Sequence, residues 1–495
     1  MSDVASQLLE FPPELASGTQ LTPEDYDMRI NHFLDTTLAN ISPSKLLAAD
    51  KEQDLLQIVD PSLNSLSYLC VLRTRVFEPS GKVRQSISPA TFTHSLEFLT
   101  KFDGVQMRYA GSSFRVLVEW VLSMASRSIN NAPEILAAVR TAIFRLDPSA
   151  GTMTSTHLHF VRACLQLRVA AEAVPLLQAT IHSFPAAKSS SIDGIYPCIS
   201  HADSTGYISY DSSLTAKLSI ADVQEYFLLS ATIWIALRRW DDALLNLELV
   251  LTSPTQGSPS GLMLEAYQKW TVVGSLINGR AIDAPKTIAG SVLRSLKTCS
   301  KAYEAVVDAF TTGNLPKLQA EIAAASQDFS ADGNMGLVQQ LPQYLPRFHL
   351  LAMQKTYSAL PLSKVANWLG QTPDAAHSFI EAVIAEGGVN AIIELRDGAH
   401  QEPVLRFFPD RASGPLAKSE KEYNAELINQ AARTNAMVDF VKMADRRLVL
   451  TKDYVDGMRK RLRNKDEDVG SLAMMEGSDP SWDASGYQDE DLMDA

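Results

Sequence analysis

Two histidines, His157 and His159, have a spacing that could hold a metal ion. In zinc isopeptidases, an H-x-H pair of this kind is completed by a serine and an aspartate further along the chain. Leu167 and Ala170 occupy the corresponding positions here, so the third ligand is missing. Side chains two residues apart on a helix also diverge by about 200°, so they cannot converge on one ion. We therefore expect two partly exposed helix histidines and no metal site.

The other residues with catalytic potential form no recognisable motif. The four cysteines, Cys70, Cys164, Cys198 and Cys299, are at least 34 residues apart, so neither a zinc pair nor a redox CxxC pair is present. The glycine-rich phosphate loops and the GxSxG nucleophile motif are also missing. The sequence therefore predicts a protein with no enzymatic activity and no cofactor, whose thiols are buried or incidental in a reducing compartment.

Acidic residues are concentrated at the C-terminus, and the rest of the chain is nearly neutral. Of the net charge of −13, residues 466–495 contribute −10 and leave only −3 for the other 465 residues. A neutral body lacks the positive field that nucleic-acid binding requires. The tail is expected to be disordered, and the basic cluster at 459–465 fits either a nuclear-import signal or a solvated helix end. We expect a protein of the cytoplasm and the nucleus.

No segment of the sequence predicts a membrane span. The longest apolar stretch, Tyr226–Leu237, has 12 residues and includes Ser230 and Thr232, so it is too short to cross a bilayer. No basic residue precedes Arg29, so the positive start of a secretory signal is missing. These features predict a soluble intracellular protein.

Most of the chain has the periodicity of short amphipathic helices. Residues 1–27 are expected to form a flexible N-terminus, followed by helical repeats over 28–217 and 218–335. A Ser-rich loop at 185–216 interrupts the pattern. Residues 236–251 read as a helix end, a turn and a second helix, similar to a tetratricopeptide hairpin. Such hairpins bury their apolar faces only against neighbours, so the sequence predicts a mainly α, tetratricopeptide-like superhelix. The clearest early helices are expected near 91–102, 111–128, 134–147, 154–168 and 170–184.

Residues 336–410 have a different pattern, which predicts a winged helix. Helical periodicity runs over 336–358, although Pro342 and Pro346 each remove a backbone donor and predict a kink or break. The period then changes from that of helices to the period of two that strands have. Two helices and two strands are expected in turn at 362–369, 373–386, 389–395 and 404–408, with a turn at 396–398 between the strands.

A winged helix often binds DNA through its third helix, so the charge of that helix bears on function. Residues 373–386 contain three acidic residues and no Lys or Arg, which would repel a phosphate backbone. The hairpin offers only Arg396 and Arg406. The sequence therefore disfavours nucleic-acid binding and favours protein contact through the hairpin, whose edge can extend into a neighbouring sheet. The predicted interface residues of the hairpin are Val389, Ile393, Val404, Leu405, Arg406 and Phe407.

Helices are expected again over 415–465, the longest at about 417–449. An apolar seam runs along this helix at spacings of three and four residues. This spacing fits either packing on the helix's own domain or a bundle seam with partner helices. The seam consists of Tyr423, Leu427, Val438, Val441 and Leu448, with Ala431 and Thr434 between them.

Helical repeats that lead into a winged helix and a long C-terminal helix resemble the PCI family. Its members are subunits of the proteasome lid, the COP9 signalosome and initiation factor three. Residues 332–338 (DGNMGLV) carry the most specific similarity, which is closest to a signalosome subunit, and residues 264–270 (LEAYQKW) add to it. The similarity runs from about 225 to 458. The chain departs from the family at Pro342 and Pro346, where a continuous helix would be expected.

The resemblance implies a non-catalytic scaffold. The COP9 signalosome removes a ubiquitin-like modifier from cullins, and its isopeptidase activity belongs to a separate metalloprotease subunit. The implied partners are therefore other PCI subunits and that metalloprotease subunit, with cullin-RING ubiquitin ligases as indirect partners. The resemblance also implies that winged helices associate side by side and that C-terminal helices join a shared bundle. A PCI subunit of the proteasome lid remains the alternative within the family.

Overall fold

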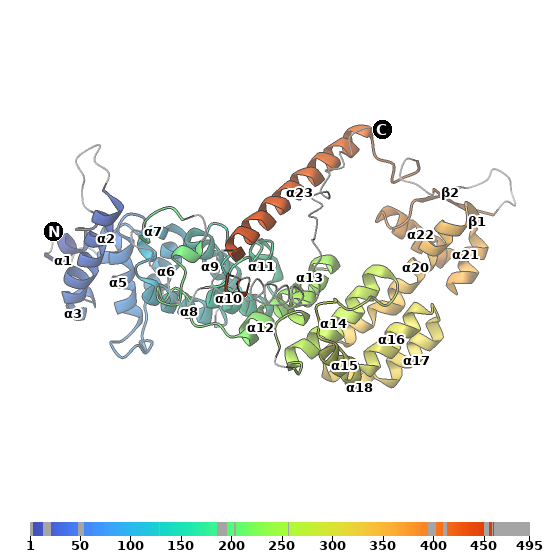
Figure 1. Cartoon of the computed structure of the whole chain (residues 1–495), viewed down its shortest axis with the longest axis horizontal. Coiled ribbons are helices and arrows are strands. Elements are labelled where there is room, and N and C mark those ends of the chain that lie inside the picture. The colour runs from blue at the N-terminus through green and yellow to red at the C-terminus, as the bar shows by residue number, and fades with distance from the viewer. Residues whose placement is uncertain are drawn as a thin grey trace, which may run out of the picture. The chain divides into compact units, whose positions relative to one another are not determined.

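The computed structural model describes residues 3–12, 21–47, 54–127, 129–185, 196–201, 204–255, 257–394, 402–408, 413–449, 455–457 and 459. The chain divides into two compact units, Met1–His349 and Leu350–Ala495, and each is described by itself (Figure 1). The acidic tail at 466–495, the turn at 396–398 and nearly all of the basic cluster at 459–465 lie outside the described residues.

The first unit begins with helices that the sequence did not predict. Residues 1–27 were expected to be flexible, but Ala5, Leu8 and Phe11 are buried in the core of the unit. Their apolar side chains are few and widely spaced, so the sequence pattern is weak while the burial is complete. The opening elements are α1 (Asp3–Leu8), α2 (Pro23–His32), the π-helix η1 (Phe33–Leu38), α3 (Pro43–Leu47), α4 (Leu55–Ile58) and α5 (Ser65–Val76).

Five of the next helices lie near the predicted ranges, although the last one ends at Leu177 and not at 184. They are α6 (Pro89–Lys101), α8 (Gly111–Ala125), α9 (Ala132–Leu146), α10 (Ser155–Gln166) and α11 (Ala170–Leu177). The short α7 (Gly104–Met107) and the 3₁₀ helix η2 (Ile129–Asn131) were not predicted. Helix α6 begins at Pro89, whose missing N–H costs nothing in a first turn, and Ser88 Oγ accepts a hydrogen bond from Thr91 N. Local start signals therefore set these boundaries well.

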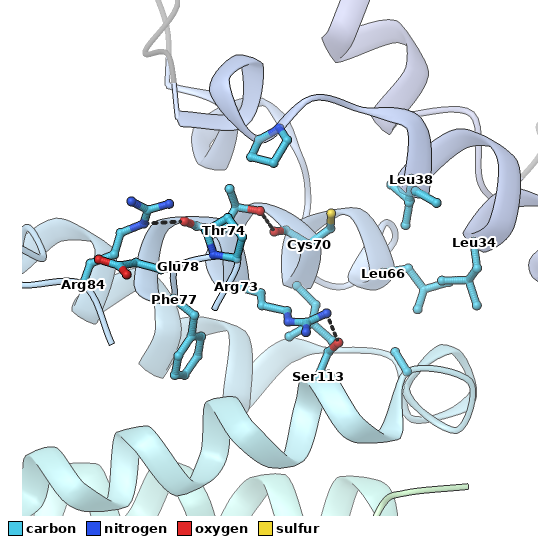
Figure 2. A pocket seen from close by; sticks show the side chains of 15 residues that line it. Leu34, Leu38, Leu66, Cys70, Arg73, Thr74, Phe77, Glu78, Arg84 and Ser113 are labelled. Atoms are coloured by element: carbon cyan, nitrogen blue, oxygen red, sulfur yellow. Dashed lines mark hydrogen bonds between the residues drawn. The ribbon is translucent and has the colours of Figure 1, made fainter. Parts of the chain in front are cut away.

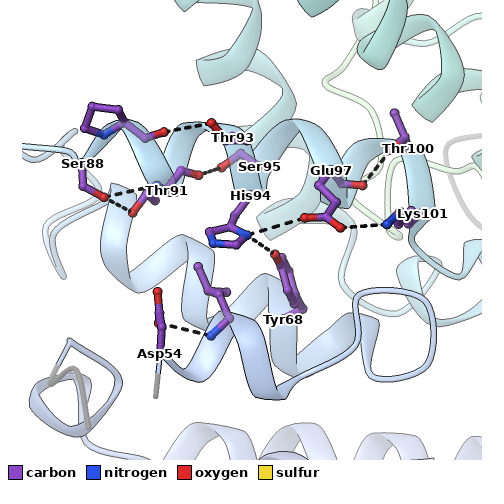
Figure 3. Close-up of polar contacts among 12 residues, drawn as sticks. Asp54, Tyr68, Ser88, Thr91, Thr93, His94, Ser95, Glu97, Thr100 and Lys101 are labelled. Carbon is purple, nitrogen blue, oxygen red and sulfur yellow. Dashed lines mark hydrogen bonds and ion pairs between the residues drawn. The ribbon is translucent and has the colours of Figure 1, made fainter. Parts of the chain in front are cut away.

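Polar side chains join α5 to α6 (Figure 3). The hydroxyl of Tyr68 on α5 lies 3.2 Å from Nδ1 of His94 on α6, and Glu97 one turn later pairs with Lys101. Two turns after Tyr68, on the same side of α5, Arg75 forms an ion pair with Asp54, and its hydrogen bonds hold the pKa of that carboxyl below its usual range. The two helices are thus tied by a buried ring contact and a polar network.

The predicted loop at 185–216 includes residues that pack in the core of the first unit. Residues 186–195 and 202–203 lie outside the described residues. From the 3₁₀ turn η3 (Ser204–Gly206) onward, the segment returns to the core, where Tyr207, Ile208 and Leu214 are buried. The guanidinium carbon of Arg108, directly after α7, lies 3.8 Å from the centre of the Tyr207 ring. This cation–π contact holds the segment against the end of α7.

Helical hairpins resume after this segment. Helices α12 (Ile220–Ala236) and α13 (Trp240–Leu251) form the expected pair, and Ala243, Leu247 and Val250 lie in its core. The following helices are α14 (Gly261–Asn278), α15 (Gly290–Cys299), α16 (Lys301–Thr311), α17 (Leu315–Ala324), α18 (Ser326–Ala331) and α19 (Met335–Val338). No helix among the described residues combines the length and the apolarity that a membrane crossing needs.

The second unit has the element order of a winged helix. Its elements are the end of α20 (Gln340–Thr356), β1 (Ala359–Pro361), α21 (Leu362–Leu369), α22 (Pro373–Ala385), β2 (Ala391–Glu394), β3 (Val404–Phe407) and the long α23 (Glu420–Val449). The strands form one antiparallel sheet in the order β1-β3-β2. Strand β1 was not predicted, because three residues that end in a proline give no readable alternation.

The proline break predicted in α20 is not seen. The helix continues through Pro346, and Pro342 falls in its first turn, where a missing N–H is tolerated. Helix α21, in contrast, ends as predicted, because Gly370 adopts the left-handed conformation (φ 66°) that closes the helix. The start of α22 is also confirmed, with Thr372 Oγ1 accepting from Ala375 N.

Candidate assembly interface

The H-x-H pair does not form a metal site. His157 is fully buried, which corrects the expectation that both histidines are partly exposed, while His159 is half-buried. The backbone N–H of Thr154 donates to Nδ1 of His157, so the ring serves as the cap of helix α10. Among the described residues there is no cluster of three or more His, Cys, Asp or Glu side chains that could hold a metal ion.

Two of the cysteines are unsuited to nucleophilic chemistry. Burial raises the pKa of the Cys164 thiol to about 12, and it also raises the pKa of Cys70. A thiol with a raised pKa carries little thiolate at neutral pH and reacts slowly. These two side chains act as small apolar groups within the first unit, as the sequence predicted for buried thiols.

Three of the predicted hairpin interface residues belong to the core of the second unit. Val389 is 1% exposed, Leu405 is 0% exposed and Phe407 is 3% exposed. A partner cannot contact these side chains without opening the module. The alternation of the hairpin was recognised correctly, but apolar side chains on the inner face were assigned to an interface although they form the core.

The other face of the sheet is available to a partner. Because side chains alternate along a strand, Val404 and Arg406 lie opposite the inner face of β3, and Arg406 is exposed. Cross-strand pairing places Ile392 and Glu394 of β2 on this same outer face, where Nε of Arg406 lies 3.0 Å from Oε1 of Glu394. The sequence analysis missed Ile392 and Glu394, although the period of two within 389–395 already separates them from the core positions.

The two edges of the sheet differ in the backbone groups that they present. Phe408 N donates to Asn390 O, and Phe407 N donates to Ser358 O. Because hydrogen-bonded and non-hydrogen-bonded residue pairs alternate along an antiparallel ladder, these two bonds show which residues of β1 and β2 turn their backbone groups toward β3. On β2, Ile393 therefore directs its N–H and C=O away from β3. On β1, Pro361 faces outward and has no N–H, so this edge is the poorer one for strand addition. Ile393, which the sequence analysis assigned to the interface, has a half-buried side chain, and its backbone lies at the edge better suited to strand addition.

Helix α22 does not have the charge that contact with DNA requires. Its exposed charged side chains include Asp374 and Glu381, and His377 Nδ1 lies 3.5 Å from Glu381 Oε2. The exposed cation of the hairpin, Arg406, is already close to Glu394. The electrostatics of this module therefore disfavour a phosphate backbone, in agreement with the sequence analysis.

Helix α23 exposes a long apolar surface. It begins with a reciprocal cap in which Ser419 and Glu422 exchange hydrogen bonds, and its described side chains are nearly all exposed. Of the predicted seam, Leu427 is 60% exposed, and Val438 and Val441 are about half exposed. Tyr423 is half-buried, and the side chain of Leu448 lies outside the described residues.

Further apolar side chains lie on other sides of α23. Ile428, Phe440 and Met443 are exposed, and at about 100° per residue they fall away from the line through Leu427 and Val438. A helix that is apolar on several sides is usually surrounded by protein. These residues therefore favour several neighbouring helices over packing on one domain. The sequence analysis missed them because it looked for one seam.

Known proteins resemble this chain over most or all of its length. A COP9 signalosome complex subunit 3 from Emericella nidulans is 27% identical over 507 residues, which cover 100% of this chain and 99% of the relative. Those from Neurospora crassa and Dictyostelium discoideum are 26% and 24% identical and cover 92% and 71% of this chain. The corresponding shares of the relatives are 91% and 74%.

The helical repeats carry the family assignment. A family model described as COP9 signalosome complex subunit 3, N-terminal helical repeats, matches residues 43–292. The matched region begins at the first residue of α3 and ends within α15, so it covers a large part of the first unit and half of the chain. The chain therefore belongs to the COP9 signalosome subunit 3 family.

Proposed function

We propose that this chain is a non-catalytic scaffold subunit of the COP9 signalosome that acts through assembly. The exposed apolar surface of α23 carries the proposal, because a 30-residue helix with exposed Leu427, Ile428 and Met437 needs a covering partner. The subunit would support removal of the ubiquitin-like modifier from cullin-RING ligases by holding other PCI subunits and the metalloprotease subunit together. The subunit itself would contribute only surfaces that bind its partners.

The hairpin supplies a second contact in this proposal. Its outer face offers Val404 and Arg406, and the backbone of Ile393 lies at the edge better suited to strand addition. Winged-helix modules of neighbouring subunits would meet here, while α23 enters a shared helical bundle. Catalysis would remain with the metalloprotease subunit, since the H-x-H pair of this chain is split between a buried and a half-buried histidine.

Affinity purification with mass spectrometry tests the proposal. Tagged wild-type chain should recover other PCI subunits and a metalloprotease subunit. Leu427→Glu combined with Val438→Glu should lose them, because two charges would lie in the apolar seam. Gln319→Glu combined with Ala323→Glu adds the same charge at exposed positions of α17, outside the proposed interface, and serves as the matched control.

Two results would overturn the proposal. If wild-type chain recovers proteasome lid subunits, the chain acts in a different complex. If the seam variant and the control recover the same partners in the same amounts, α23 is not the assembly element. Circular dichroism of both variants checks that the helix content is retained, since all four positions are exposed.

A further inference from the structure

A groove of about 430 Å³ lies in the first unit, between its N-terminal helices and α5 (Figure 2). Its lining comes from η1, α3, α5, the segment that follows α5 and the start of α8. The volume lies within the range of about 300–1,000 Å³ that is typical of ligand sites. All of the lining belongs to the first unit, so the assembly surfaces of α23 and the hairpin do not account for it.

One wall of the groove is apolar. Leu34 and Leu38 of η1 are half-buried and face the groove from the N-terminal side, while α5 and its C-terminal end supply buried side chains. Such a wall favours aliphatic or aromatic side chains over water. The apolar residues that line it are Leu34, Leu38, Leu66, Leu69 and Phe77.

Two arginines line the same groove without an acidic partner. Arg73 Nη1 donates to Ser113 Oγ at 3.1 Å, and Arg84 Nε donates to the carbonyl oxygen of Thr74 at 2.9 Å. Within the described ranges, no carboxylate lies at ion-pair distance from either guanidinium, although Arg75 on the same helix is paired with Asp54. Each guanidinium keeps N–H donors that could bind an anion.

The charge of the lining favours an anionic ligand. Its ionisable side chains other than Cys70 are Arg73, Arg84 and Glu78, so the lining carries a net charge of +1. Glu78 accepts a hydrogen bond from Ser80 Oγ and forms no ion pair within the described part of the chain. A carboxylate near the arginines would gain two charge-assisted hydrogen bonds if Arg73 or Arg84 bound it bidentately.

We propose that this groove binds a short acidic and apolar segment of another protein, with its apolar side chains on the leucine wall and carboxylates on Arg73 and Arg84. Polar atoms on the rim support a peptide over a fatty acid. The hydroxyls of Thr74 and Ser113 line the groove beside the arginines and match the polar groups of a peptide backbone. Thr74 Oγ1 donates to the carbonyl oxygen of Cys70 and can still accept from a peptide N–H, and Ser113 Oγ accepts from Arg73 and can still donate to a peptide carbonyl. A fatty acid chain would use neither capacity.

Fluorescence anisotropy with the full-length chain tests this site. The probe is a short fluorescein-labelled peptide of alternating leucine and aspartate, with leucine–lysine and serine–aspartate peptides as comparisons. Wild-type chain should bind the leucine–aspartate peptide saturably. Arg73→Glu combined with Arg84→Glu should weaken binding by at least about tenfold, since charge-assisted hydrogen bonds contribute about 1.5–3 kcal/mol each. Arg294→Glu, at an exposed position on α15, should leave binding unchanged.

A second variant tests the apolar part of the groove. Ala39 lines the groove and is exposed, so Ala39→Trp should fill the space without removing a core side chain and should weaken binding to a similar degree. The proposal is overturned if the leucine–aspartate peptide does not bind saturably, if it binds no more tightly than the comparison peptides, or if the groove variants bind it as the wild type does. Tighter binding of octanoate, measured by displacement of the peptide, would reassign the groove to a fatty acid.

Discussion

Burial keeps the imidazole of His157 neutral, and this gives the first unit a pH-dependent stability. Removal from water lowers the pKa of this side chain to about 4, against the opposing influence of the Asp147 carboxylate. In the unfolded chain the same group titrates near 6.5. Between these two values the unfolded state binds a proton that the folded state does not, so stability falls as the pH falls through this window.

We expect the free energy of unfolding of the first unit to fall by about 2 kcal/mol between pH 7 and pH 5 on account of His157. His157→Gln should remove this pH dependence, while the amide oxygen of Gln at this position can still accept from the backbone N–H of Thr154, as in a capping box. His159→Gln, at a half-buried position two residues away, is the matched control and should retain the dependence. Urea unfolding at the two pH values measures the dependence in both variants, and an unchanged slope in His157→Gln would contradict the assignment.

Sequence alone identified the residue types that matter but not their burial. The H-x-H spacing gave no sign that His157 would be buried and His159 half-buried. That difference depends on which side of α10 meets α8, α9 and α12, which is a long-range property. Likewise, Leu405 and Val404 both look apolar in the sequence, and only the packing of the sheet separates core from surface.

At the scale of the element, the two faces of the hairpin should respond differently to added charge. Leu405→Asp places a charge in the core and should destabilise the second unit by at least about 3 kcal/mol. Val404→Asp lies on the outer face and should change stability by less than about 1 kcal/mol while weakening complex formation. Thermal unfolding followed by co-purification separates the two effects. If Val404→Asp unfolds the unit, the register of β3 is wrong.

Long helices with clear start and stop signals were predictable, and the short or interrupted elements were not. Helices α6, α9 and α22 begin at prolines in their first turns, and α21 ends at a left-handed glycine, so local chemistry is sufficient there. Strand β1 exists only because β3 pairs with it. Helix α20 passes through Pro346 because packing on both sides of the proline outweighs one lost backbone hydrogen bond.

At the scale of the whole molecule, the charge distribution sets the choice of partner. The net charge of the chain is −13, and residues 466–495 contribute −10 of it. The rest of the chain therefore has no excess of positive charge. Helix α22 adds acidic side chains at the surface where a DNA-binding winged helix would need basic ones. The order of elements that often suggests DNA binding therefore occurs here with electrostatics that favour proteins.

We expect no measurable affinity for duplex DNA even at low salt, because few phosphates could be neutralised. A salt titration of binding, from about 20 mM upward, checks this directly, since electrostatic binding is strongest at low ionic strength. A chain truncated after residue 465 is the control, because it lacks the acidic tail. If that shorter chain binds DNA tightly, the tail masks a basic surface, and the protein-only assignment fails.

Pro361 also bears on how this protein avoids uncontrolled self-association. Open strand edges allow identical copies to add to one another without limit, and such growth needs two compatible edges on every copy. Here one edge faces outward with a residue that has no N–H, and its strand is only three residues long. The β2 side is therefore the better edge for a neighbour, and the β1 side is poorly suited to pass the same pairing on. A single imino acid removes one of the donors that the β1 edge could offer, which should make an open series of identical copies less favourable.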